Sequence, residues 1–318
     1  MADRLKGKVA IVTGAGRGIG RGEALLLAAE GAAVVVNDPG VNPDGTGHDN
    51  GPADQVVAEI RARGGRAAAN YGDVSSFEDA RAMVQQALDT FGHLDIVVNN
   101  AGILRDRMVY NLTEQEWDAV IAVHLKGTFN VTHHACVIFR QQRNGRIVNT
   151  SSTSGLGNMG QANYSAAKEG IVGFTRTVAR DMGRYGVTCN AIRPSAGTRL
   201  TVNPQLETAA RRAVEVIPTA TLLADYEELT KLAPETVAPL VAYLCTDEAG
   251  YINGRVFVVR GKEIGLYPEP EPVRSIFAPG PRWTLDELVE LAPQTIGFGL
   301  CNEWAPAQPQ TISLLALA

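Results

Sequence analysis

Tyr164 and Lys168 are the two residues whose types and spacing best suggest chemistry. On a helix they lie one turn apart on the same face. A cation beside a phenol favours the phenolate, so we expect Lys168 to lower the pKa of Tyr164 from its usual value of about 10. Hydroxyl groups just upstream, at residues 150–154, can hydrogen-bond the oxygen that gains or loses the proton. Together these groups predict an acid/base centre for alcohol and ketone chemistry.

A glycine-rich turn near the N-terminus predicts a dinucleotide site. Val9–Thr13 is a short β-branched run typical of a buried strand, and a helical stretch is expected at residues 21–30. Glycines between them permit a tight turn and a close backbone approach, and the helix N-terminus then faces a pyrophosphate. The residues expected to bind the cofactor here are Gly14, Arg17, Gly18, Ile19 and Gly20.

Asp38 follows the second expected strand, residues 33–36. An acidic residue about 20 positions beyond the glycine turn accepts hydrogen bonds from the adenosine ribose and repels a 2′-phosphate. Arg17 would instead favour NADP, because its guanidinium could bind that phosphate. Since Asp38 lies where the ribose edge should fall, we predict NAD rather than NADP.

Strands and helices alternate along the rest of the chain. Further strands are expected at 66–70, 94–98, 146–150, 187–192 and 255–259, and helices at 53–63, 77–91, 115–140, 163–182 and 234–245. This alternation predicts a Rossmann-type, doubly wound parallel sheet of seven strands with helices on both faces. Ligands of such sheets bind at the carboxyl ends of the strands. The cofactor residues expected at those ends are Asp73, Val74, Asn100, Ala101, Gly102, Pro194, Ala196 and Gly197.

The composition excludes several other classes of protein. A net charge of −5 over 318 residues gives no basic footprint for nucleic acid. No apolar run is long enough to span a membrane, and neither the four cysteines nor the five histidines show metal-ligand spacing. Strand-like sequence begins within about eight residues of the start, which leaves no room for a signal peptide, so we expect a cytoplasmic protein.

The chain divides into two expected domains. Residues 1–265 form the dinucleotide-binding catalytic domain, and residues 266–318 form a proline-rich C-terminal extension with one helix at 284–291. Within the segment 198–232, the apolar run 214–223 (VEVIPTATLL) suggests a lid over an apolar substrate, while an ordinary helix pair packed on the core explains it nearly as well. The extension either wraps a partner subunit or caps the pocket.

Assembled, these motifs resemble those of the short-chain dehydrogenase/reductase family. TGAGRGIG at 13–20, NNAG at 99–102, the serine cluster and YSAAK at 164–168 occur in the family's order and spacing, and the resemblance covers residues 5 to 262. More specifically, VVVNDPG at 34–40, NNAGILRDR at 99–107 and GQANYSAAK at 160–168 are similar to the dehydrogenase domains of the peroxisomal type 2 multifunctional enzymes. That subfamily oxidises (3R)-hydroxyacyl-CoA with NAD.

The resemblance implies roles for the catalytic residues. Tyr164 takes the hydroxyl proton, a serine orients the same oxygen, and Lys168 lowers the tyrosine pKa and holds the nicotinamide ribose. Both Tyr164 and Lys168 are thus also expected to bind the cofactor. The usual serine-to-tyrosine interval selects Ser151, whereas alignment on the strand and the SSxSG pattern selects Ser152, which we prefer. His124 stands where the family usually has a relay asparagine. The family also implies a homodimer or homotetramer, formed through the helices at 115–140 and 163–182.

The implied reaction is oxidation of a (3R)-hydroxyacyl-CoA to the 3-ketoacyl-CoA, with a bulky acyl group such as a steroid side chain under degradation. Basic residues at the pocket mouth would favour CoA, and the candidates are Arg105, Arg107, Arg199, Arg211 and Arg212. A free 17β-hydroxysteroid is the alternative substrate. A dinucleotide-sensing protein that has lost its chemistry is the alternative class, against which the intact Ser152, Tyr164 and Lys168 argue.

Overall fold

The computed structural model describes residues 3–202, 207–208 and 222–302. Met1–Tyr267 form one compact unit and Pro268–Ala318 a second. The expected boundary after residue 265 falls inside the last strand of the first unit, β8 (Glu263–Leu266).

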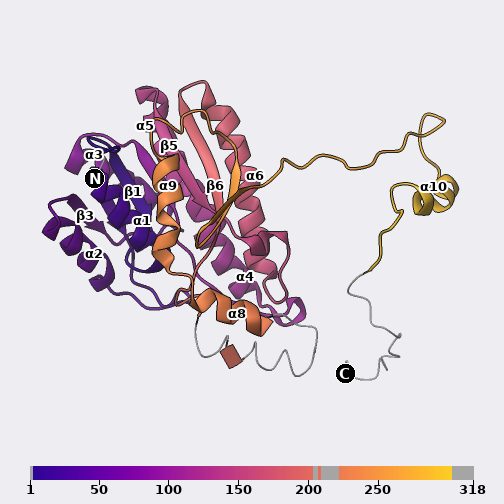
Figure 1. Cartoon of the computed structure of the whole chain (residues 1–318), viewed down its shortest axis with the longest axis horizontal. Coiled ribbons are helices and arrows are strands. Elements are labelled where there is room, and N and C mark those ends of the chain that lie inside the picture. Colours follow the sequence, from indigo (N-terminus) through magenta and orange to yellow (C-terminus); the bar gives the residue numbers. More distant parts are fainter. Residues whose placement is uncertain (1–2, 203–206, 209–221, 303–318) are drawn as a thin grey trace. The chain divides into compact units, whose positions relative to one another are not determined.

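The first unit is built on one sheet with the strand order β3-β2-β1-β4-β5-β6-β7-β8 (Figure 1). The seven expected strands are present and parallel, which confirms the predicted fold. Their bounds are β1 Val9–Thr13, β2 Ala33–Asn37, β3 Arg66–Asn70, β4 Ile96–Asn99, β5 Gly145–Thr150, β6 Val187–Ser195 and β7 Val256–Arg260. The chain order reverses between β1 and β4, and in such sheets ligands bind at the carboxyl ends of the strands on either side of this switch point.

An eighth strand, β8, corrects the expected number of strands. It pairs antiparallel with β7, and Arg260 lies opposite Glu263 across a two-residue turn at Gly261 and Lys262. Gly261 has φ +56, a conformation that glycine adopts freely. The sequence EIGL contains no apolar run that would predict a buried strand, because β8 is a mostly exposed edge strand.

Two apolar cores lie on the two faces of the sheet. On one face α1 (Gly18–Ala29), α2 (Gly51–Ala62) and α9 (Ala238–Leu244) pack on alternate strand residues such as Val12 and Val36. On the other face α3 (Phe77–Phe91), α5 (Gly127–Gln142) and α6 (Ala162–Gly183) pack on the intervening residues, such as Ile11 and Val35. Burial on both faces explains why these strands read as continuous apolar runs.

The helix expected at 115–140 is interrupted. It begins with a capping box between Thr113 and Glu116 and runs as α4 (Glu114–Ile121). A π-helical turn, Ala122–Lys126, then adds a residue to the turn before α5 begins. Such turns are frequent at functional sites, and this one carries His124.

Only part of the expected lid can be described. The apolar run 214–223 lies outside the described residues except for the backbone at the start of α8 (Leu222–Thr230). The next helical stretch consists of a short turn at Pro234–Thr236 followed by α9. No helix in the described part of the chain is long and apolar enough to cross a membrane.

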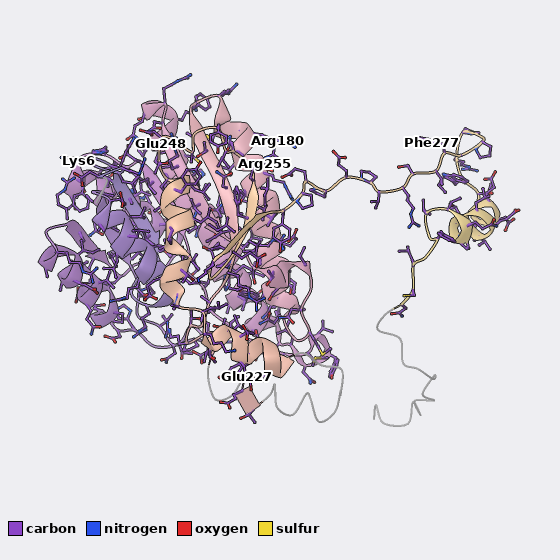
Figure 2. The ribbon with its side chains drawn as sticks, in the orientation of Figure 1. Lys6, Arg180, Glu227, Glu248, Arg255 and Phe277 are labelled. Atoms are coloured by element: carbon purple, nitrogen blue, oxygen red, sulfur yellow. The ribbon has the colours of Figure 1, made fainter. Side chains whose placement is uncertain are left out.

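The second unit contains α10 (Leu285–Leu291), which begins with a capping box between Thr284 and Glu287. Its apolar side chains are mostly exposed within that unit, and Phe277, labelled in Figure 2, is 87% exposed.

Candidate active site

Helix α6 brings Tyr164 and Lys168 onto one face, as their spacing predicts. The ammonium nitrogen of Lys168 lies 5.4 Å from the centroid of the Tyr164 ring and donates to the carbonyl oxygen of Thr150 at 2.6 Å. The start of the helix is fixed by the buried Asn163, whose Nδ2 donates to the carbonyl oxygen of Arg105 at 3.0 Å. Tyr164 is thereby positioned by contacts from a distant segment as well as by its own helix.

The two adjacent serines after β5 have different contacts. Ser151 is buried, and its hydroxyl donates to the backbone carbonyl oxygen of Lys168 at 2.7 Å. The Ser152 hydroxyl lowers the pKa of the Tyr164 phenol, and its Oγ accepts from the N–H of Ser154 at 3.1 Å. Ser152 is therefore the serine that acts on the pKa of Tyr164, whereas the Ser151 hydroxyl is engaged with the backbone of Lys168.

The expected lowering of the Tyr164 pKa is not observed. Burial raises the pKa of Tyr164 to about 12, opposed by the hydrogen bond from Ser152 and reinforced by the negative charge of Asp106. Burial also lowers the pKa of Lys168 to about 7. Burial thus acts on both groups in the direction of their neutral forms.

His124 is buried beside the acid/base centre. Its ring meets the Tyr164 ring edge-on with centroids 5.1 Å apart, and its Nε2 lies 2.8 Å from the carbonyl oxygen of Ile103. Burial lowers the pKa of His124 to about 3, so the imidazole is neutral at physiological pH. A side chain at Gly102 would clash with this ring, which explains the glycine in the NNAG sequence.

A cavity of about 750 Å³ opens at the carboxyl ends of β1 and β4. Eleven of the predicted cofactor residues line it, namely Gly14, Arg17, Gly18, Ile19, Asp38, Asp73, Val74, Asn100, Ala101, Gly102 and Gly197. Five others do not, namely Gly20, Tyr164, Lys168, Pro194 and Ala196. Of these, Gly20 packs against the backbone of Gly14, because a Cβ on Gly20 would lie only 2.5 Å from the carbonyl oxygen of Gly14.

The glycine turn fits a dinucleotide. Gly14 has φ +62, and a Cβ on it would lie 2.8 Å from the Cα of Ala101, so only glycine lets these two backbones approach. The first turn of α1 has no capping side chain, because Arg17 at its start makes no such hydrogen bond. Its N–H groups therefore suit a bound phosphate at the end of the cavity.

Asp38 is held rigidly at the end of β2. Its Oδ2 accepts from the N–H of Gly16 at 2.9 Å, and its Oδ1 accepts from the N–H of Gly40 at 2.7 Å. Arg17 instead lies 3.7 Å from a carboxylate oxygen of Asp49. The negative charge is thus fixed in the cavity wall, whereas the competing arginine is directed towards another carboxylate.

The segment 39–50, which joins β2 to α2, forms part of the cavity wall. Its Val41, Gly45 and His48 are lining residues, and Gly45 packs against Ile103, which also lines the cavity. The carbonyl oxygen of Val41 accepts from Arg199 at 2.8 Å. Its many Gly, Pro and Asp residues predict turns. They do not predict where on the sheet the loop packs.

Within the described part of the chain, no group of three His, Cys, Asp or Glu side chains is placed so that it could hold a metal ion.

A parallel sheet with a glycine-walled cavity at its switch point and a Ser-Tyr-Lys cluster beside it defines a dehydrogenase that uses a nicotinamide dinucleotide. A family model described as short chain dehydrogenase matches residues 8–208. This chain therefore belongs to the short-chain dehydrogenase/reductase family.

Relatives of this chain include both long and short proteins. The peroxisomal multifunctional enzyme type 2 of Mus musculus is 47% identical over 264 residues, which cover 82% of this chain and 33% of that enzyme. The hydroxyacyl-CoA dehydrogenase ChsB1 of Mycobacterium tuberculosis is 42% identical, over 89% of this chain and 87% of that protein. The crystal structure of a short chain dehydrogenase from Mycobacterium avium has a TM-score of 0.76 at 44% identity, covering 92% of this chain and 95% of that one.

Proposed function

We propose that this chain oxidises a secondary alcohol carried on an acyl-CoA, with NAD as the hydride acceptor. The observation that carries this proposal is the cluster of Ser152, Tyr164 and Lys168 next to a glycine-walled cavity. His124 links cluster and cavity, because it packs on Tyr164 and contacts Ile103, which lines the cavity. An alcohol bound at this junction would have the base on one side and the nicotinamide on the other.

Each residue of the cluster has a proposed role. Tyr164 takes the proton of the alcohol, and Ser152 hydrogen-bonds the same oxygen and orients it. Lys168 favours the phenolate when it is charged and holds the nicotinamide ribose together with Tyr164. When bound, the nicotinamide supplies the redox chemistry by accepting the hydride.

The proposal of NAD rests on Asp38. Its fixed carboxylate would accept hydrogen bonds from the ribose hydroxyls and repel the phosphate of NADP. The unblocked N-terminus of α1 would receive the pyrophosphate. Pro194, Ala196 and Gly197, at the end of β6, would contact the nicotinamide end.

A (3R)-hydroxyacyl-CoA is the substrate we propose. One relative is named as a hydroxyacyl-CoA dehydrogenase, and the (3R) isomer is what the resemblance to the peroxisomal type 2 multifunctional enzymes implies. Exposed apolar side chains gather near the catalytic residues, namely Met108, Val109, Tyr110, Leu156 and Met159. The two runs that carry them are joined where Arg107 donates its N–H to the carbonyl oxygen of Gly160 at 2.8 Å. Such a surface would suit a bulky acyl group, such as a steroid side chain.

The second candidate is a 17β-hydroxysteroid without CoA, which the same apolar surface would favour. Among the arginines considered for CoA, Arg105 donates to the carbonyl oxygen of Asp44 at 2.8 Å and Arg107 lies 3.3 Å from Glu116. Arg211 and Arg212 lie outside the described residues.

The proposal also includes a homodimer or homotetramer in the cytoplasm. The exposed aromatic residues Phe129 on α5 and Trp117 on α4 are consistent with self-association.

The test compares (3R)- and (3S)-hydroxyacyl-CoA with NAD and with NADP, for the wild type and for Tyr164→Phe. We expect the wild type to use the (3R) isomer and NAD preferentially. Tyr164→Phe should still bind NAD, measured by fluorescence titration, and lose turnover. Preserved turnover in this variant would overturn the catalytic assignment, and a preference for NADP would overturn the role given to Asp38.

A further inference from the structure

Arg193 is a buried arginine near the end of β6, and the proposed function gives it no role. The residue is only 3% exposed. Its Nη1 donates to the backbone carbonyl oxygen of Ser152 at 3.1 Å, and its Nη2 donates to a carboxylate oxygen of Glu169 at 2.8 Å. The planar guanidinium therefore joins β6 to the segment that follows β5 and to helix α6, which carries Tyr164 and Lys168.

Two further contacts enclose the guanidinium of Arg193. It lies over the Tyr267 ring, 4.9 Å from the ring centroid, and Tyr267 donates its N–H to the carbonyl oxygen of Val256 at 2.9 Å. Gly155 packs against the ion pair, because a Cβ there would lie 2.8 Å from the Glu169 carboxylate and 3.4 Å from Nη1 of Arg193. Since desolvation offsets much of the attraction in a buried ion pair, stability alone does not account for this arrangement.

The carbonyl oxygen that Arg193 contacts belongs to the proposed catalytic serine. The same oxygen accepts from the N–H of Gly155 at 3.1 Å, and the Ser152 Oγ accepts from the N–H of Ser154 at 3.1 Å. These two hydrogen bonds are local to the short turn Thr153–Leu156 and its start. The hydrogen bond from Arg193 instead ties the serine to β6, so it fixes the position of Ser152 relative to the sheet.

We infer that Arg193 is a positioning residue for the reaction, whose guanidinium holds the Ser152 backbone so that the serine hydroxyl meets the oxygen of the alcohol. Glu169 and Tyr267 fix the guanidinium in turn. Arginine suits this task better than lysine, because its planar fork reaches two acceptors in a fixed geometry. A displacement of about 1 Å at a reacting group can cost on the order of a hundredfold in rate. This inference rests on the proposed function, in which Ser152 orients the substrate.

The first test measures kcat and KM for alcohol oxidation in Arg193→Met, which keeps an unbranched apolar side chain and removes both hydrogen bonds. We expect kcat to fall roughly tenfold, less than on loss of the Ser152 hydroxyl itself. KM for NAD should stay within about twofold, because Arg193 is not one of the described residues that line the cofactor cavity. Arg193→Lys can reach one of the two acceptors and should recover part of kcat. A wild-type kcat in Arg193→Met, or a change confined to KM for NAD, would overturn the inference.

Arg146 on the neighbouring strand β5 provides a matched control. It is also buried, donates to the carbonyl oxygen of Gly145 at 2.9 Å and lies 3.2 Å from a carboxylate oxygen of Asp247. It stands at the beginning of its strand, whereas the site lies at the carboxyl ends. Arg146→Met should therefore leave kcat within about twofold of the wild type. A similar loss of kcat in both arginine variants would reveal a general effect on the fold and contradict the inference.

Tyr267 allows a milder change that leaves the ion pair in place. Tyr267→Phe keeps a ring over the guanidinium and should retain the wild-type kcat. Tyr267→Ala removes the ring, and we expect kcat to fall by about two- to fivefold as Arg193 becomes less well fixed. Equal values of kcat in the alanine variant and the wild type would show that the ring does not help to fix Arg193.

A double-mutant cycle shows whether Arg193 acts through Ser152. In the Ser152→Ala background, Arg193→Met should change kcat by less than about twofold, because the hydroxyl that it positions is already absent. Losses that simply add in the double variant would place the action of Arg193 elsewhere and overturn the inference.

Amide hydrogen exchange gives a readout that does not need turnover. In Arg193→Met, the N–H of Gly155, which donates to the Ser152 carbonyl oxygen, should exchange at least about threefold faster. It should exchange at the wild-type rate in Arg146→Met. Unchanged exchange at residues 152–157 in Arg193→Met would contradict the inference even if every substrate tested were inert. Faster exchange in a protein that oxidises none of the alcohols would support the contact and contradict the proposed function.

Discussion

Tyr164 and Lys168 have pKa values that burial moves in opposite directions, to about 12 and about 7. The spacing of the two residues could be predicted from the sequence because it depends only on the helix. The direction of the tyrosine pKa could not, since it depends on burial by distant segments and on Asp106, which is tied to Gln161 across 55 positions of the chain.

The raised pKa of Tyr164 predicts how oxidation depends on pH. Below its pKa, the phenolate fraction grows about tenfold for each pH unit, so kcat/KM for oxidation should rise steadily between about pH 7 and about pH 10. Reduction uses the protonated phenol and should not rise over this interval. Initial rates in both directions measure this, and a flat oxidation profile would contradict the assignment of Tyr164 as the base.

Substitution of the two serines should have different effects, one on turnover and the other on stability. Ser152→Ala removes the hydroxyl that contacts Tyr164, and we expect kcat to fall by roughly 10² to 10³. Ser151→Ala removes a hydrogen bond to the backbone of Lys168, and we expect a loss of about 1 kcal/mol in the free energy of unfolding with most turnover retained. Steady-state kinetics and urea denaturation of both variants measure the two effects. The reverse pattern would make Ser151 the catalytic serine.

Among the elements, the strands were the most predictable. Apolar runs that are buried on both faces predicted β1, β2, β4, β5 and most of β6. The expected β3 and α3 coincide with the observed ones, although β3 is only partly buried. The interruption between α4 and α5 was not predictable, because the apolar periodicity continues through the π-helical turn. Edge strand β8 was missed because its side chains are mostly exposed, although Gly261 and Lys262 form a turn typical of a hairpin.

Helix α1 carries a buried carboxyl group that should make stability depend on pH. Both carboxyl oxygens of Glu23 are buried without a partner among the described residues, and burial raises its pKa from 4.5 to about 8. The folded protein therefore binds more protons than the unfolded chain between these two values. The free energy of unfolding should decrease as pH rises through this interval, by at most about 1.4 kcal/mol per pH unit.

Glu23→Gln should remove this contribution. Urea denaturation from pH 5 to pH 9 (about the interval in which the linkage acts) should give a flatter stability curve for the variant, with its largest relative gain above about pH 8. The matched control is Glu78→Gln, which changes an exposed carboxylate on α3 that pairs with Arg81 at 2.8 Å. Parallel curves for wild type and Glu23→Gln would show that Glu23 is ionised or solvated in the folded protein.

At the scale of the whole molecule, every residue placed in the candidate site belongs to the first unit, Met1–Tyr267. The second unit contributes several strongly exposed apolar side chains of its own, among them Val273 and Phe277. From the run of prolines, the sequence analysis expected an extension that begins at residue 266.

A chain ending at Tyr267 should therefore fold and bind NAD. We expect a dissociation constant for NAD within about twofold of the full chain, since a twofold change is only about 0.4 kcal/mol. Fluorescence titration measures the affinity, and circular dichroism checks the fold. Loss of NAD binding in a folded truncated chain would show that residues 268–318 complete the cofactor site.

The measurement that tests the central claim most directly is NAD reduction by the purified full chain. Straight-chain (3R)-hydroxyacyl-CoAs, a steroid hydroxyacyl-CoA and free 17β-hydroxysteroids would be offered in parallel, with Tyr164→Phe as the inactive control. Turnover confined to the CoA thioesters, and lost in the control, is the predicted result. Turnover of a free steroid at comparable efficiency would contradict the assignment of an acyl-CoA substrate.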